Sequence, residues 1–242
     1  MSDPRSRRGA RIAGRAHKAL ARVKAQPHAG PANGAFRYAV GGLWDEMGAA
    51  QFDYLVAQGL RPEHRLLDIG CGTLRGGVRF IPFLDPGNYF GIDISQEMLD
   101  AGEQELALAG ISNRRHTLRQ TSEFEMRFED TQFDYALAQS VFTHIDLNQI
   151  LRCLLNVQQV LAPAGRFYAT FLENPAGKNS LDPVCHPQPG VADTVTFLDR
   201  DPFHYSLDAF EWACTGTELT VDYIGDWGSP RGQKMLLFRK AG

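Results

Sequence analysis

The sequence predicts a doubly wound α/β fold: a seven-stranded, mostly parallel sheet with an antiparallel C-terminal strand and helices on both faces. Two observations carry this prediction. From residue 65 onward, short apolar runs alternate with segments of helical periodicity, a pattern typical of βαβ units around a parallel sheet. Near the C-terminus, two further apolar runs are separated by only about ten residues, which is too short for a helical crossover and predicts an antiparallel hairpin.

Each expected element has a local reason. Strands are predicted where compact apolar runs lie between turn residues, over 65–69, 89–94, 115–119, 133–138, 166–171, 219–223 and 234–238. Helices are predicted where apolar residues recur at three- and four-residue spacing, over 43–60, 75–83, 95–109, 147–162 and 207–215. Ser95 and Ser206 stand at expected N-caps, and Pro163-Ala164-Gly165 ends the fourth helix.

The chain divides into a tail and one expected domain. Residues 1–30 hold eight Lys or Arg and one acid, so 1–33 are interpreted as a basic, disordered tail. A docking arm for an acidic surface and a transit peptide are the alternatives for it. A single domain is expected over 34–242. Its parts are a leading helix (43–60), a core (65–172), a lid loop (174–205) and a C-terminal helix and hairpin (206–240).

Composition narrows the function classes. The chain has 242 residues, of which 43% are hydrophobic, and a net charge of −3, which gives no reason to expect nucleic acid as a partner. The apolar runs are too short to span a membrane. The four cysteines lie far apart without a CxxC pair, so neither a metal site nor a disulfide framework is expected, and a cytoplasmic location is predicted.

The run RLLDIGCGTLRGG, followed by YFGIDIS, is the main functional motif. A predicted strand runs into a turn at Gly70 and Gly72, where the backbone can approach a ligand without a Cβ clash. Asp93 follows at the end of the next strand, where an acid commonly accepts hydrogen bonds from ribose hydroxyls. A nicotinamide site would require GxGxxG, but Arg75 occupies the third glycine position.

These motifs resemble those of class I S-adenosylmethionine-dependent methyltransferases. LDIGCGTLRGG is similar to the first motif of that family, and GIDIS is similar to the second. The stretch SEFEMRFEDTQFDYALAQSVFTHI resembles the third and fourth motifs, and a helix and strand follow in the family's order. The resemblance covers about 65–172, and it implies that this core binds S-adenosyl-L-methionine as cofactor.

The resemblance also implies roles for the residues at matching positions. Asp68 and the turn Gly70-Cys71-Gly72 would flank the methionine part of the cofactor, and Asp93 would bind its ribose hydroxyls.

The adenine would meet a second set of residues. Ile94 and Met98 would lie against its ring, and Ser122 and Glu123 at its edge. Ser122 departs from the family, which usually has Asp there, so Glu123 is expected to serve instead. Gln139 would lie under the cofactor after the fourth strand.

Candidates for catalysis and acceptor binding lie outside these motifs. His144, after the fourth strand, and His204, at the end of the lid loop, are candidate general bases, because a proton-bearing acceptor has to lose its proton. A structural role is the alternative for each. Tyr205, Trp227 and Arg231 are expected to line an acceptor pocket. The alternative for Tyr205 is that it packs the domain wall. The alternative for Trp227 and Arg231 is that they belong to a simple hairpin turn.

The sequence therefore predicts methyl transfer to a small-molecule acceptor, by in-line displacement and preferably to a hydroxyl. The fourth motif reads AQSVF where amino-group methyltransferases tend to carry Asn/Asp-Pro-Pro-Tyr, which argues against nucleobase amino groups. Two alternatives stay open: an RNA or protein methyltransferase that docks through the basic tail, and a cofactor-binding protein without catalysis. The sequence does not determine the oligomeric state.

Overall fold

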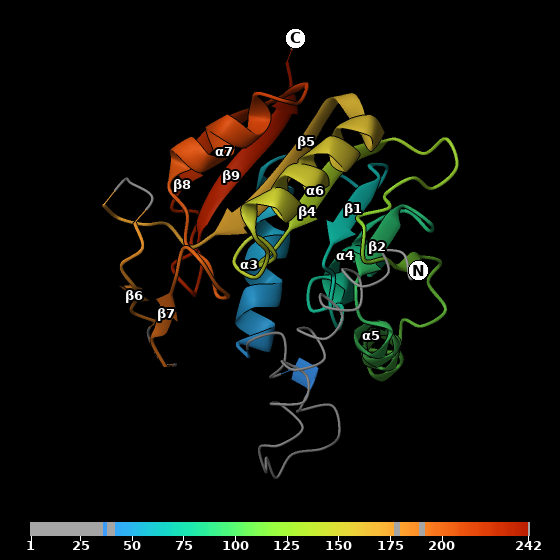
Figure 1. The fold of residues 1–242 in the computed structure, drawn as a ribbon. Coiled ribbons are helices and arrows are strands. Elements are labelled where there is room, and N and C mark those ends of the chain that lie inside the picture. Colours follow the sequence, from blue (N-terminus) through green and yellow to red (C-terminus); the bar gives the residue numbers. More distant parts are fainter. Residues whose placement is uncertain (1–35, 38–41, 177–179, 189–191, 242) are drawn as a thin grey trace, which may run out of the picture.

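One seven-stranded sheet organises the structure, a computed structural model that describes residues 36–37, 42–176, 180–188 and 192–241 (Figure 1). The tail predicted over 1–33 lies outside the described residues. Five strands are parallel to their neighbours, and the last two pair antiparallel. In spatial order the strands are β3 (Thr117–Gln120), β2 (Tyr89–Asp93), β1 (Leu66–Ile69), β4 (Phe133–Ala138), β5 (Leu161–Phe171), β9 (Lys234–Lys240) and β8 (Leu219–Gly225).

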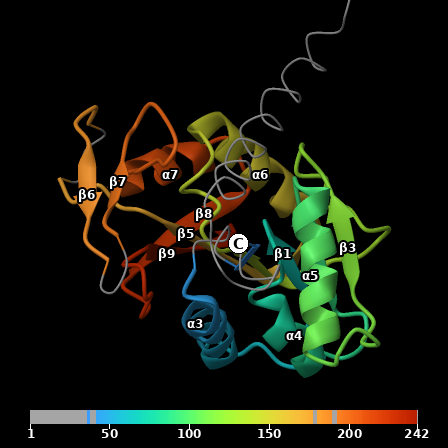
Figure 2. The ribbon, with the colours of Figure 1, turned by 90° about the horizontal axis from the view of Figure 1, so that it is seen from below.

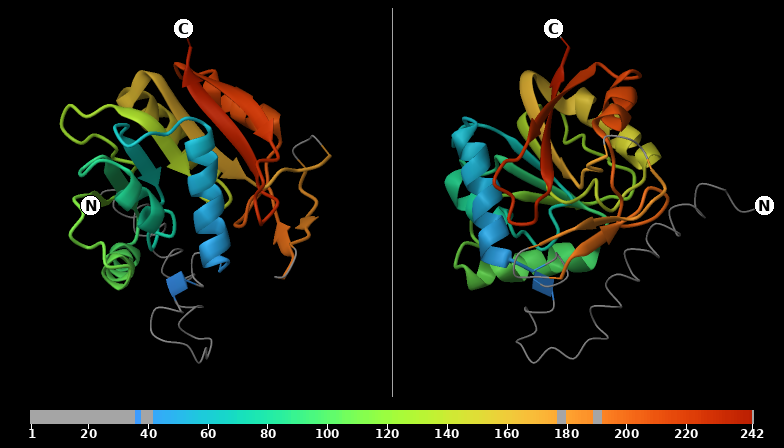
Figure 3. Two further views of the ribbon diagram at one scale, coloured as in Figure 1. Left: turned by 180° about the vertical axis from the view of Figure 1, so that it is seen from behind. Right: turned by 90° about the vertical axis from the view of Figure 1, so that its left-hand side faces the viewer.

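Helices cover both faces of this sheet, which confirms the predicted fold class. One face carries α3 (Trp44–Ala57), α4 (Gly77–Phe83) and α5 (Gln96–Leu108), and the other carries α6 (Leu147–Val160) and α7 (Leu207–Cys214) (Figure 3). Each face has its own buried apolar cluster. Within the described residues, no helix combines the length and the apolar character that a membrane crossing requires.

The strand order indicates which edge of the sheet binds a ligand. We call this edge, at the carboxyl ends of the parallel strands, the ligand edge. The chain runs from β1 outward to β2 and β3, then returns to the other side of β1 for β4 and β5. The two directions of winding separate at the carboxyl ends of β1 and β4, which is where open α/β sheets bind their ligands. The turn at Gly70 and the side chain of Asp93 both lie at this edge.

Helix α5 is capped as predicted, whereas α7 is not. The Ser95 hydroxyl accepts a hydrogen bond from the backbone N–H of Met98 at 3.3 Å, so it caps α5. Ser206 occupies the N-cap position of α7 without making a capping bond, because its hydroxyl donates to the Asp208 carboxylate. The sequence located the starts of both helices, but it did not indicate that the Ser206 hydroxyl bonds to Asp208.

The start of β5 differs from the prediction. Helix α6 ends at Val160, and β5 begins at Leu161 rather than at residue 166. Its register with β4 shifts between the pairs Phe133–Leu161 and Tyr135–Arg166. A Cβ on Gly165 would lie 2.7 Å from Leu161 Cγ and 2.8 Å from the Phe133 carbonyl oxygen. The turn residues that were expected to separate helix from strand therefore form an irregularity within the strand.

The predicted lid loop over 174–205 contains a second, two-stranded sheet. Strands β6 (Val184–His186) and β7 (Thr194–Thr196) pair antiparallel. They lie on the opposite side of the molecule from α5 and β3 (Figure 2). Strands of three residues are too short to show an alternating apolar pattern, so no pattern in the sequence indicated them.

Candidate functional site

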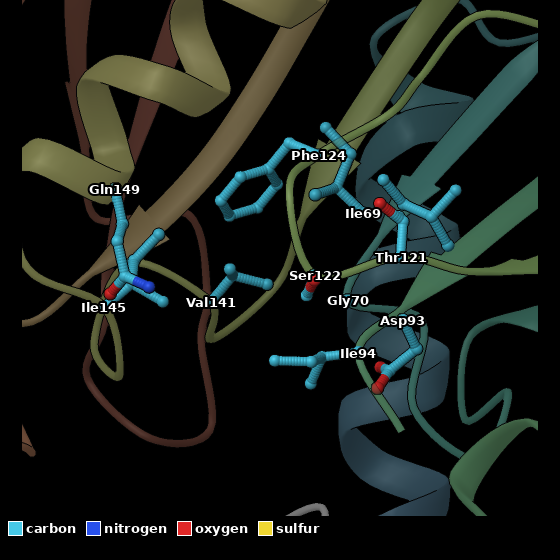
Figure 4. Close-up of a pocket in the computed structure, with 11 residues that line it drawn as sticks. Ile69, Gly70, Asp93, Ile94, Thr121, Ser122, Phe124, Val141, Ile145 and Gln149 are labelled. Atoms are coloured by element: carbon cyan, nitrogen blue, oxygen red, sulfur yellow. The ribbon is translucent and has the colours of Figure 1, made fainter. Parts of the chain in front are cut away.

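A pocket opens at the carboxyl edge of the sheet, beside the glycine turn (Figure 4). The side chains of Phe124, Val141 and Ile94 converge on it, and Asp93 lies at its side. Its wall is mainly apolar, with a carboxylate and two hydroxyls among the lining groups. The lining residues are Ile69, Gly70, Ile92, Asp93, Ile94, Thr121, Ser122, Phe124, Val141, Ile145 and Gln149.

Asp93 joins the ends of two strands. Its Oδ2 accepts a hydrogen bond from the backbone N–H of Gly72 at 2.8 Å, and its Oδ1 accepts one from Ser95 at 2.9 Å. A carboxylate offers about four acceptor positions, so about two remain for a ligand. Burial raises the pKa of Asp93, and the N–H groups of Ser95, Gly72 and Ile94 oppose that shift. The site therefore presents an oriented carboxylate to hydroxyl donors.

The turn after β1 requires glycine at its first position. Gly70 has φ +68°, in the left-handed region, and a Cβ there would lie 2.5 Å from Val141 Cγ2. Gly72 also has a positive φ, at +55°. The backbone thus passes close to Val141, which only a residue without a Cβ allows.

A buried polar group lies beneath the turn. Asp68 is 4% exposed, and its Oδ2 accepts a hydrogen bond from the Tyr89 hydroxyl at 2.7 Å. Burial raises the pKa of Asp68 to about 6, against the opposing effect of that hydrogen bond. Burial also raises the pKa of Cys71 well above its usual value, with Asp68 and Asp93 adding to the shift, so the thiol is neutral.

The structure brings together most of the predicted cofactor residues. Gly70, Asp93, Ile94 and Ser122 line the pocket. Asp68, Cys71 and Gly72 are not among the lining residues, and they support the turn from below or within it.

Three further predicted cofactor residues, in addition to Asp68, Cys71 and Gly72, do not line the pocket. Glu123 forms an ion pair with Arg152, so it is not held at the pocket as expected. The side chain of Met98 projects from α5, outside the lining set. Gln139, at the end of β4, is 8% exposed and bonds with a neighbouring loop instead.

Gln139 belongs to a buried polar network at the ends of β4, β5 and the start of β9. Gln233 Oε1 accepts hydrogen bonds from Gln139 Nε2 at 2.8 Å, Ser140 Oγ at 3.0 Å and Thr170 Oγ1 at 3.0 Å. Trp227 Nε1 donates to the Gln233 carbonyl oxygen at 2.9 Å. This network holds the loop between β8 and β9 against the ends of β4 and β5, and Trp227 is not among the residues that line the pocket.

His144 lies in the segment between β4 and α6. It stands between the lining residues Val141 and Ile145, and its Nδ1 lies 2.7 Å from Asp201 Oδ1. The side chain is 60% exposed. A carboxylate that accepts from Nδ1–H leaves Nε2 as an acceptor, which is the form a general base needs. His144 does not line the pocket, so its role as a base remains a proposal.

The structure corrects the expectations for His204 and Tyr205. His204 is fully buried, with Nδ1 3.0 Å from Thr196 Oγ1 and Nε2 3.2 Å from the Ser180 carbonyl oxygen. Both ring nitrogens are engaged within the segment 174–205, so the histidine is not available as a base. Tyr205 is 3% exposed, donates to the Ile145 carbonyl oxygen at 2.9 Å and stacks on Phe203, so it is a core residue.

His186 belongs to the same hydrogen-bonded group as His204 and Thr196, and its protonation provides a test of that group. Its Nε2 lies 2.8 Å from Thr196 Oγ1, and burial, followed by the charge of His204, lowers its pKa. The folded protein therefore takes up the proton at a lower pH than the unfolded chain, whose value is about 6.5. Unfolding free energy should fall as pH drops below about 6.5, and His186→Gln should reduce that slope. Urea unfolding between pH 5 and 8 measures both slopes, and equal slopes would contradict the assignment.

Several functional residues were missed by the sequence analysis. Thr121 and Gln149 line the pocket, and Gln149 also closes a capping box with Asp146 at the start of α6. Arg75, which occupies the third glycine position of the GxGxxG pattern, lies beside the turn and is 6% exposed. The capping box was the available signal for Gln149, because Asp146 and Gln149 stand three residues apart before an apolar run.

Comparisons with known proteins agree with this geometry. A family model described as a methyltransferase domain matches residues 67–167. The uncharacterized methyltransferase YcgJ of Bacillus subtilis is 25% identical over 175 residues, which cover 70% of this chain and 62% of that protein. The ubiquinone/menaquinone biosynthesis C-methyltransferase UbiE of Vibrio campbellii is 30% identical over 62% of this chain and 59% of the relative. This chain thus matches less than two thirds of the length of either relative.

Solved structures share the fold at low sequence identity. Magnesium protoporphyrin IX methyltransferase (ChlM) of Synechocystis PCC 6803 with bound S-adenosylmethionine superposes with a TM-score of 0.62 at 12% identity, over 100% of this chain and 99% of the other. An S-adenosylmethionine-dependent methyltransferase of Clostridium acetobutylicum gives a TM-score of 0.61 at 13% identity, over 86% and 96%. The family match over 67–167, together with the sheet order and the glycine turn, identifies this part of the chain as a methyltransferase domain.

Proposed function

We propose that this protein transfers a methyl group from S-adenosylmethionine to a small-molecule acceptor, at a hydroxyl oxygen. The observation that carries the proposal is the pocket in which Asp93, Gly70 and Ser122 meet at the carboxyl ends of β1, β2 and β3. The relatives' names add support for the substrate class, since UbiE is named for quinone biosynthesis and ChlM for magnesium protoporphyrin IX. The sequence AQSVF after β4 favours a hydroxyl over a nucleobase amino group.

The residues present fit this cofactor. Asp93 keeps about two acceptor positions for ribose hydroxyls while it holds the turn. Ile94 and Phe124 offer apolar surface to an adenine ring, and Ser122 offers a hydroxyl at its edge. Gly70 lines the pocket, and its backbone lies close to the Val141 side chain because no Cβ stands between them. When bound, the cofactor supplies a methyl group on a sulfonium. The neutral thioether S-adenosylhomocysteine is the leaving group, and it leaves readily.

The protein then has to position the acceptor and handle its proton. Alignment of two reactants is worth up to about 7–11 kcal/mol in favourable cases. A general base adds about 10²–10⁴-fold when the acceptor carries a proton. His144, oriented by Asp201, is the base that we propose, and Trp227 is proposed to shape the acceptor side. The four cysteines form no disulfide, which supports a cytoplasmic location as part of the proposal.

Calorimetric titration with S-adenosylhomocysteine tests the cofactor site. Wild type should bind, and Asp93→Ala should weaken binding by about 10- to 100-fold, because hydrogen bonds to a charged group are worth about 1.5–3 kcal/mol. Asp134→Ala is the matched control. Asp134 Oδ2 also accepts a backbone N–H, from Arg65 at 2.9 Å, but at the start of β4, away from the pocket.

The outcomes separate the alternatives. Equal losses in both variants would mean that Asp93 acts only through folding. A wild-type protein that binds neither S-adenosylmethionine nor S-adenosylhomocysteine would refute the proposed function. Incubation with methyl-tritiated S-adenosylmethionine and separate pools of phenols, amines and carboxylic acids then tests the acceptor. Label that appears only in the amine pool would refute oxygen as the acceptor atom.

A further inference from the structure

The side chain of Gln149 lines the pocket from the first turn of α6. Its Oε1 accepts a hydrogen bond from the backbone N–H of Asp146 at 3.2 Å, and its own backbone N–H donates to Asp146 Oδ1 at 3.0 Å. Because a backbone N–H can only donate, this capping box determines which end of the Gln149 amide is the oxygen. The amide nitrogen is therefore the end that does not face the backbone of Asp146.

The Gln149 amide has a donor and an acceptor to offer a ligand. Within the part of the chain that the structure describes, its Nε2 has no hydrogen-bond partner. Nε2 carries two N–H donors, and Oε1 keeps a second lone pair beside the bond from Asp146. A planar amide of this kind complements a ring edge on which an amino group stands next to a ring nitrogen. Glutamine pairs with adenine in this way when it contacts the bases of DNA.

The position of Gln149 in the pocket indicates which part of a ligand it would meet. Figure 4 shows Gln149 on one side of the pocket and Asp93 on the opposite side. Between them lie the apolar side chains of Phe124, Val141 and Ile94. A nucleoside whose ribose hydroxyls are bound by Asp93 would lay the flat faces of its base against these apolar side chains. The polar edge of the base would then be directed toward Gln149.

The residues that the sequence assigned to the adenine edge leave this role open. Glu123 pairs with Arg152, which lies on α6 three residues after Gln149, so its carboxylate is engaged outside the lining of the pocket. The same ion pair joins the segment after β3, which carries Phe124, to the helix that carries Gln149. Ser122 contributes one hydroxyl, and a hydroxyl can either donate or accept. Ser122 alone therefore does not distinguish an amino group from an oxo group on a base.

We propose that Gln149 recognises the edge of the cofactor's adenine that carries the exocyclic amino group. Oε1 accepts a hydrogen bond from the amino group, and Nε2 donates one to the neighbouring ring nitrogen. The inference rests on the proposed function, and it assigns the specificity for the base to a residue of α6. A base with an oxo group in place of the amino group would bring an oxygen against Oε1. The amide does not turn over to accommodate it, because Oε1 is bonded to the backbone of Asp146.

Calorimetric titration of the full-length protein with S-adenosylhomocysteine and S-inosylhomocysteine, which has the oxo group, tests this specificity. Wild type should bind S-adenosylhomocysteine about 10- to 100-fold more tightly than S-inosylhomocysteine. Gln149→Met removes both polar atoms, so it should weaken the binding of S-adenosylhomocysteine alone and bring the two Kd values close together. Gln149→Glu keeps an oxygen that caps α6 and replaces the amide nitrogen with a second acceptor. It should also weaken S-adenosylhomocysteine binding, because an oxygen then faces the lone pair of the ring nitrogen.

Gln158→Met is the matched control. Gln158 lies on the same helix, and its Oε1 also accepts a backbone N–H, from Glu218 at 2.8 Å, but it is not among the residues that line the pocket. This variant should discriminate between the two nucleosides as wild type does.

Three outcomes would overturn the role of Gln149. The first is a wild type that binds both nucleosides equally well. The second is discrimination that survives in both Gln149 variants. The third is an equal loss of affinity for both nucleosides in Gln149→Met while Gln149→Glu binds like wild type, because Gln149 would then act only by capping α6. A wild type that binds neither nucleoside would instead refute the proposed function.

Discussion

Asp68→Asn is expected to stabilise the folded protein at pH 8 by about 3 kcal/mol. The pKa of Asp68 rises from an ordinary value of 3.8 to about 6 on folding, chiefly because of burial. A shift of about two units corresponds to about 3 kcal/mol. Above pH 6 the folded protein holds a buried charge that the unfolded chain keeps in water, so the wild type loses stability as pH rises from 3.8 to 6. Asparagine avoids that cost and still accepts a hydrogen bond from Tyr89.

Urea unfolding of wild type and Asp68→Asn between pH 4 and pH 8 measures this effect. The gain should shrink as pH falls through 6 and become small near pH 4, where the aspartate is protonated in the folded protein and close to its ordinary pKa of 3.8 in the unfolded chain. Tyr89→Phe is the opposite control, because it removes the hydrogen bond of 2.7 Å and should destabilise the protein most above pH 6. A constant difference between Asp68→Asn and wild type across this range would show that charge burial is not the cause.

The same substitution should weaken binding of S-adenosylhomocysteine. Asp68 lies beneath the turn and opposes the positive charge on Arg75, so its loss alters both the turn's support and the electrostatic balance. Asp68→Asn would then add stability and weaken ligand binding. This combination is expected where a protein keeps a destabilising buried charge because its activity needs it.

Gly70→Ala should destabilise the protein by about 2–5 kcal/mol and weaken S-adenosylhomocysteine binding. An alanine in the left-handed region costs about 1–2 kcal/mol. Its Cβ would also lie 2.5 Å from Val141 Cγ2, and overpacking of this kind costs about 1–3 kcal/mol. Thermal and urea unfolding measure the stability, and calorimetry measures the binding.

Gly110→Ala separates the two costs. Gly110 has φ +70°, nearly the same as Gly70, but nothing lies within 4 Å of a Cβ built there. It should lose only about 1–2 kcal/mol and bind S-adenosylhomocysteine normally. In a double-mutant cycle, Val141→Ala should recover part of the loss caused by Gly70→Ala. If Gly70→Ala cost no more than Gly110→Ala, the close approach of Val141 would not constrain the turn.

The sequence predicted those features that depend on short-range patterns. Apolar runs and turn residues located all seven strands of the main sheet, and the ten-residue spacing gave the antiparallel pair. Gly70 and Asp93 were predicted to lie together because the ends of neighbouring parallel strands meet at one edge, and both line the pocket. The irregular start of β5 was missed, since it depends on how Gly165 packs against Phe133 on another strand.

Features that depend on long-range partners were not predictable. His204 was read as a base because a histidine at a loop end is suggestive, but its role is decided by Thr196 and by Ser180, 24 residues away. Glu123 was expected at the adenine edge, and its pairing with Arg152 on α6 cannot be read from sequence.

The double hydrogen bond of Asp93 has a consequence for the energetics of ligand capture. Because the carboxylate already holds the N–H groups of Gly72 and Ser95, the turn and the start of α5 are preorganised by the protein's own bonds. A ligand that arrives there does not have to immobilise the loop, so less of its interaction energy is spent on ordering the protein. The glycine turn is therefore already in its ligand-binding arrangement before a ligand arrives, which favours lock-and-key association at this edge of the sheet.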